Sequence, residues 1–103
     1  MKIARNGKVI LTVRIDVSPE GEDEFNEWYQ VEHIPNLLKV PGVLNAKRGL
    51  LYDGDGPTYI AIYEHLNDEV AQNSAYKQAI ETEWTRKIRQ YFKKVEVHRF
   101  YEI

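Results

Sequence analysis

The chain has 103 residues, 43% of them hydrophobic and 12% aromatic, so it is the size of a single domain with one core. Its 14 lysines and arginines against 16 aspartates and glutamates give a net charge of -2, without the basic stripe typical of nucleic-acid binding. It has no cysteine, no apolar leader and no apolar run near the roughly 20 residues of a membrane span, so we expect a cytoplasmic protein with no disulfide and with neither a nucleic-acid nor a membrane partner.

The first predicted element is a strand from Val9 to Val17, in which every second residue is apolar. A helix is predicted to begin at Ser18 and Pro19, because serine is a preferred N-cap and proline suits the first helical position. Pro35 lacks an amide donor, so we expect it to kink this helix or restart it as a short turn through Lys39.

Aromatic residues recur along that helix at steps of three and four, which places them on one face. The residues of this face are Phe25, Trp28 and Tyr29, with Glu32 and His33 at its edge. A histidine beside an aromatic wall is the strongest candidate in the chain for an acid or a base.

A second strand is predicted from Val43 to Tyr52 and a third from Tyr59 to Leu66, joined by the turn-forming segment 53–57, so that the two form an antiparallel hairpin. The third strand is apolar or aromatic on both faces, which indicates that both are covered. One row contains Ile60, Ile62 and Leu66, and the other contains Tyr59, Ala61, Tyr63 and His65.

Asn67 or Asp68 is predicted to cap a second helical region, with an interruption near Asn73 and Ser74. Its apolar stripe consists of Val70, Ile80, Trp84, Ile88 and Tyr91. The last predicted strand runs from Val95 to Ile103.

This order predicts a ferredoxin-like βαββαβ fold: a four-stranded antiparallel sheet with the first and third strands central and both helical regions on one face. We expect the apolar row of the first strand to face the helices. The other face would then carry Thr12, Arg14, Asp16 and the tyrosine row of the third strand, a surface too aromatic for solvent. A homodimer through this open sheet face would cover it.

The sequence resembles the dimeric α+β barrel superfamily, and within it EthD-like proteins, over a single domain spanning residues 1–103. The resemblance rests on Trp28-Tyr29, Glu32-His33-Ile34-Pro35, Leu37-Leu38 and Val40-Pro41-Gly42, and in the second half on Tyr76, Ala79, Thr82-Glu83-Trp84 and 86–92. It implies a pocket between sheet and helices, and cofactor-free oxygenases, cyclases, isomerases or decarboxylases among its members. His33 matches the histidine of the family's His-x-Pro motif.

Two functional hypotheses follow. In the first, the protein binds a small apolar or aromatic molecule, with His33 as general acid or base in a cofactor-free cyclisation, isomerisation or oxygenation. Trp28, Tyr29 and Trp84 would form the walls, and Tyr63 or Arg48 the polar anchor.

In the second hypothesis the protein is a non-catalytic ligand-binding or structural homodimer. The aromatics then fill the core, and His33 hydrogen-bonds the backbone that Pro35 frees. A pocket of roughly 300 Å³ or more, lined by His33 and at least two of the aromatics, would favour the first hypothesis.

No metal or cofactor is predicted. The three histidines lack metal-ligand spacing, and the acidic segment 53–56 lacks the remaining calcium ligands, so it is interpreted as a hairpin turn. The basic run 86–94 lies near a helix C-terminus, where cations complement the helix dipole.

Overall fold

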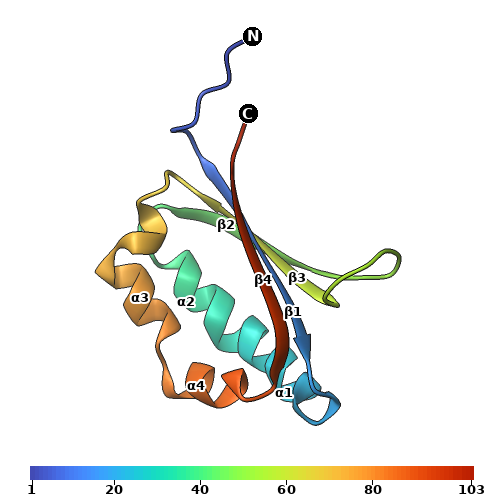
Figure 1. Cartoon of the computed structure of the whole chain (residues 1–103). Helices are drawn as coiled ribbons and strands as arrows, with labels where there is room; N and C mark the ends of the chain where they lie inside the picture. Colours follow the sequence, from blue (N-terminus) through green and yellow to red (C-terminus); the bar gives the residue numbers. More distant parts are fainter.

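The computed structural model describes residues 1–103 and contains one antiparallel sheet of four strands (Figure 1). The strands are β1 (Val9–Val17), β2 (Val43–Leu50), β3 (Tyr59–His65) and β4 (Phe92–Tyr101). Their order is β2-β3-β1-β4, with β1 and β3 in the centre and every neighbouring pair antiparallel. The predicted ferredoxin-like fold is confirmed.

The first crossover is an almost continuous helical segment with an expanded turn in its middle. It consists of η1 (Pro19–Gly21), α1 (Glu22–Trp28), the π-helical turn η2 (Tyr29–His33) and α2 (Ile34–Leu38). In η2 the amide of Ile34 donates to the carbonyl of Tyr29, five residues back. A wider turn accommodates a proline, which would clash with the carbonyl four residues before it in a regular helix, so Pro35 continues the helix instead of kinking or restarting it.

The second crossover is broken twice, into η3 (Val70–Gln72), α3 (Ser74–Ile80) and α4 (Glu83–Arg89). The break predicted near Asn73 is present, and the Asn73 side chain accepts a hydrogen bond from the amide of Tyr76. A second, unpredicted break lies before Thr82, whose hydroxyl caps α4.

Both crossovers lie on the same face of the sheet, as Figure 1 shows. Their apolar side chains and the inward row of β1 form the core. None of the helices has the length and apolar character needed to cross a bilayer.

The tyrosine row of β3 faces the helices, so its predicted position on the open face is wrong. Pairing places Tyr63 opposite Leu11 and Ala61 opposite Val13, and Tyr63 and Ala61 are 1% and 2% exposed. The alternation of side chains along β3 assigned its residues to two rows correctly, but the pairing register with β1 determines which row faces the helices.

The open face is therefore mixed, with isoleucines among charged residues. Arg14 donates to the backbone carbonyls of Pro57 and Asp55, and the Asp16 carboxylate accepts from the amide of Thr58. These charged side chains hold the loop that joins β2 to β3, so their contacts are structural.

Candidate functional site

A cavity of about 250 Å³ lies between the helices and the β4 side of the sheet. Its lining from the sheet side is Leu11, Val13, Ile15, Tyr63, Phe92, Val95, Val97 and Arg99, and from the helices Trp28, Tyr29, His33, Leu37, Tyr76, Ile80, Thr85 and Arg89. We call it the apolar cavity. Its volume is below the roughly 300 Å³ that the sequence analysis gave as favouring the first hypothesis. It is open along β4, where Val95 and Val97 are 47% and 42% exposed. Its size suits a molecule of one or two rings.

His33 lies at the expanded turn η2 and lines this cavity. Its ring stacks on Trp28 at 4.3 Å between centroids and meets Tyr29 edge-on at 5.1 Å. Its Nδ1 is buried without a hydrogen-bond partner, so the expected bond to the backbone freed by Pro35 is absent. Burial, assisted by the positive charge of Arg89, lowers the pKa of His33 to about 4, so the imidazole is neutral at pH 7.

Two tyrosines complete the polar part of the wall. Tyr63 is buried, and its hydroxyl has no hydrogen-bond partner. Burial raises the pKa of Tyr29 to about 12 and raises the pKa of Tyr63 as well, so both hydroxyls keep their protons. A neutral histidine and protonated phenols can donate to or accept from a carbonyl or hydroxyl of a ligand.

A threonine pair at the start of α4, which the sequence did not point to as part of the site, fixes the tryptophan wall. The indole of Trp28 donates to the Thr85 hydroxyl at 3.2 Å. The Thr82 hydroxyl bonds both Thr85, at 3.0 Å, and the Glu32 carboxylate, at 2.6 Å. Threonine is a preferred N-cap and Glu83 follows it in the first turn, so the pair Thr82-Glu83 is a helix-start signal that could have located this break.

One predicted wall residue, Trp84, and one predicted polar anchor, Arg48, do not line the cavity. Trp84 is partly exposed, and its indole donates to Glu24 at 3.1 Å, because the break before α4 turns Thr85 and Ile88 toward the core instead. Arg48 lies on the β2 side, with its guanidinium carbon 4.4 Å from the centre of the Tyr29 ring and a hydrogen bond to Asn26 at 2.7 Å. The structure thus brings Trp28, Tyr29, His33 and Tyr63 together without them.

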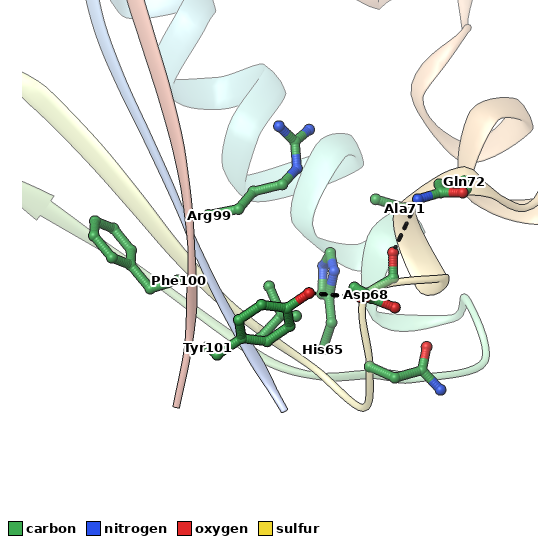
Figure 2. Close-up of a pocket in the computed structure, with 9 residues that line it drawn as sticks. His65, Asp68, Ala71, Gln72, Arg99, Phe100 and Tyr101 are labelled. Atoms are coloured by element: carbon green, nitrogen blue, oxygen red, sulfur yellow. Dashed lines mark hydrogen bonds between the residues drawn. The ribbon is translucent and has the colours of Figure 1, made fainter. Parts of the chain in front are cut away.

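A second cavity, of about 490 Å³, lies at the end of the sheet where the chain termini emerge (Figure 2). We call it the polar cavity; its lining is Val9, His65, Asn67, Asp68, Ala71, Gln72, Arg99, Phe100 and Tyr101. In Figure 2 the Tyr101 hydroxyl points to Asp68, to which it donates at 2.7 Å. No three histidine, aspartate or glutamate side chains lie close enough together to hold a metal ion.

A family model described as a domain of unknown function, DUF4286, matches residues 8–100 of the chain. A comparison with curated proteins finds no match. The family model thus covers nearly the whole fold, and the finer expectation of an EthD-like protein stays a prediction.

Solved structures with the same fold are similar over nearly their whole length. A conserved protein of unknown function from Bacteroides thetaiotaomicron has a TM-score of 0.68 at 14% identity, covering 93% of this chain and 98% of that one. A variant of SnoaB, a cofactor-independent oxygenase from Streptomyces nogalater, has a TM-score of 0.65 at 17% identity, covering 93% of each chain. A dabb family protein with a ferredoxin-like fold from Mesorhizobium loti has a TM-score of 0.67 at 10% identity, covering 94% and 98%. At these identities the similarity shows the fold alone.

Proposed function

The chain belongs to the DUF4286 family, whose description assigns no activity. We propose that its one domain binds a small aromatic molecule in the apolar cavity. The observation that carries this proposal is a hollow of about 250 Å³ beside an otherwise packed core, lined by His33 and Tyr63, whose Nδ1 and hydroxyl are buried without a hydrogen-bond partner. Buried polar groups normally have partners, so these two are suited to a ligand with a carbonyl or hydroxyl group.

The test of binding uses naphthamide, a neutral two-ring probe with a carbonyl group. The nitrogen–proton correlation spectrum should show the Trp28 indole signal moving on titration while the Trp84 signal stays in place, because only Trp28 lines the cavity. A Trp84→Phe variant assigns the two signals. An unchanged Trp28 signal at millimolar naphthamide would refute the proposal.

We further propose that the neutral His33 imidazole is the proton acceptor for an enolisable ligand. The carbon–hydrogen bond of the ligand would break, its proton would pass to His33, and the enolate oxygen would accept a hydrogen bond from the Tyr63 hydroxyl. A pKa of about 4 makes His33 a weak base in the empty cavity, but an enolate beside the imidazolium would stabilise the charged form. SnoaB, a cofactor-independent oxygenase with the same fold, supports the proposal, because an oxygenase without a cofactor has only its own side chains to activate a substrate.

This chemistry is tested by deuterium exchange at the activated carbon of tetralone in heavy water, followed by nuclear magnetic resonance. We expect the wild-type protein to accelerate exchange and the His33→Gln variant to lose the acceleration while still binding naphthamide. Exchange at the rate of buffer alone, with binding intact, would instead establish a non-catalytic ligand-binding protein, the alternative that the low pKa of His33 favours.

We propose that two copies pair through the open sheet face. Its apolar residues form a band across the strands, made of Ile10, Ile60, Ile62 and Phe100, and Phe100 is 54% exposed. The superfamily that the sequence resembles forms dimers of this kind.

Sedimentation velocity at micromolar concentration tests the pairing. The wild-type protein should sediment as a dimer, and Ile62→Lys, which places a charge beside Lys47 in the middle of the band, should shift it to the monomer. Leu38→Glu changes an exposed leucine of α2 on the helix side and should leave the dimer intact. A wild-type monomer would overturn the proposal.

A further inference from the structure

Arg99 lies between the two cavities and contributes to the wall of both. It is on the helix-facing side of the edge strand β4, opposite Leu11. Figure 2 shows its side chain extending from β4 toward the helix layer. None of the three ion pairs in the structure involves Arg99, so its positive charge has no carboxylate partner.

The charge around the apolar cavity is one-sided. Its lining contains two arginines and no aspartate or glutamate. Arg89 is already paired, donating to both carboxylate oxygens of Glu81 at 2.6 and 3.3 Å. Arg99 is therefore the one cation of this wall whose guanidinium is free to bind an anion, and a guanidinium binds carboxylates with two parallel hydrogen bonds.

The polar cavity on the other side of Arg99 contains a buried polar group without a partner. His65 lines the cavity and is 2% exposed, and its Nε2 is buried without a hydrogen-bond partner. Burial and the charge of Arg99 lower the pKa of His65, so its ring is neutral at pH 7. The acidic residue of this cavity, Asp68, already accepts the Tyr101 hydroxyl.

We propose that the polar cavity is a subsite for an anionic group of the ligand, with Arg99 binding a carboxylate and His65 Nε2 as a second hydrogen-bond partner. The two cavities then form one site around Arg99, with the ring system of the ligand in the apolar cavity and its carboxylate at the guanidinium. The ligand class is an aromatic carboxylic acid. This inference rests on the proposed binding function and assigns the chemistry of its ligand.

The test compares naphthoate with naphthamide by isothermal titration calorimetry, since the two probes share their ring system and differ in charge. Wild-type protein should bind naphthoate about tenfold or more tightly than naphthamide, because hydrogen bonds to a charged group are the stronger kind. Arg99→Gln should remove this preference, measured as the ratio of the two affinities in the same variant. His65→Gln should weaken naphthoate binding by a smaller factor.

Arg86→Gln is the matched control, because Arg86 is an exposed arginine of α4 that lines neither cavity. It should keep the full preference for naphthoate, which excludes a general effect of net charge. Equal affinities for the two probes in the wild-type protein, or a preference that survives Arg99→Gln, would overturn the subsite and leave the binding function standing. Failure of both probes to bind would overturn the two proposals together.

Discussion

The helices cover one face of the sheet, and the two halves of that face, the β2 side and the β4 side, differ sharply in how closely they are packed. On the β2 side, Phe25 is fully buried, and Asn26 connects the Arg48 guanidinium to the Tyr59 hydroxyl, which also bonds Glu22. One polar atom there, Arg48 Nε, lacks a partner. On the β4 side the same helices leave the apolar cavity, whose wall contains the unpartnered groups of two side chains, His33 and Tyr63.

This difference teaches that stability and binding are concentrated in different parts of one small core. Close packing contributes most of the free energy of folding, while a cavity forfeits dispersion contacts. The filled side therefore maintains the fold, and the hollow side retains the space and unpaired polar atoms that a ligand needs. Variants on each side can test whether the two respond separately.

The largest effect is expected from removing the central aromatic of the filled side. Phe25→Ala should lower the free energy of unfolding by about 3–5 kcal/mol, since it leaves a cavity among four aromatic neighbours. Val97→Ala, on the exposed wall of the hollow side, should cost less than about 1 kcal/mol. Urea denaturation of the two variants measures the contrast, and similar losses would show that the two sides are equally packed.

The next effect is a loss of stability in acid through His33. Its pKa is 6.5 in the unfolded chain and about 4 in the fold, so between these values the unfolded state binds more protons and stability falls as pH falls. The loss should be on the order of 2–3 kcal/mol between pH 6.5 and pH 4. Thermal melts of His33→Gln should show a correspondingly flatter dependence, whereas His98→Gln, changed on the open face, should keep the wild-type dependence.

Enlarging a side chain should lower the stability on the filled side but not on the hollow side. Ala61 is 2% exposed on the central strand β3, so Ala61→Leu should cost about 1–3 kcal/mol through overpacking. Val97 lines the apolar cavity, so the larger side chain of Val97→Phe would occupy empty space. This variant should keep a nearly unchanged melting temperature and lose naphthamide binding. Retained binding in Val97→Phe would place the ligand elsewhere.

The smallest effect is expected at the threonine that holds the tryptophan wall. Thr85→Val keeps the shape of the side chain but removes the acceptor for the Trp28 indole, which should cost about 1 kcal/mol in chemical denaturation. Thr12→Val on the open face should stay within about 0.5 kcal/mol of wild type. Equal effects of the two changes would show that the indole finds another acceptor.

The sequence predicted the topology because the first strand alternates clearly and the segments between the strands contain clear helix-start and turn-forming residues. It could not decide which row of β3 faces the helices, because both rows are apolar and only long-range pairing selects one. It also missed the break before Thr82, and with it the rotation that turns Trp84 outward, because the apolar spacing continues across the break.

The aromatic wall was accessible from local spacing, since Trp28, Tyr29 and His33 lie on one helical segment. The roles of Arg99 and Thr85 could not be predicted from local spacing. Arg99 matters because it lies between two cavities, and Thr85 because it accepts a hydrogen bond from an indole 57 residues away. Groups that depend on contacts between distant segments leave no mark in the local pattern.

The expanded turn at Tyr29–His33 contains one residue more than an ordinary helical turn. One extra residue offsets whatever follows by roughly 100° about the helix axis. The length of this turn therefore sets how the part before it, with Phe25 and Trp28, is oriented relative to the part after it, with Leu37. Deleting the exposed Gln30 would rotate the two parts relative to each other. The loss or gain of a single codon can therefore change the shape of this site in a way that a point substitution cannot.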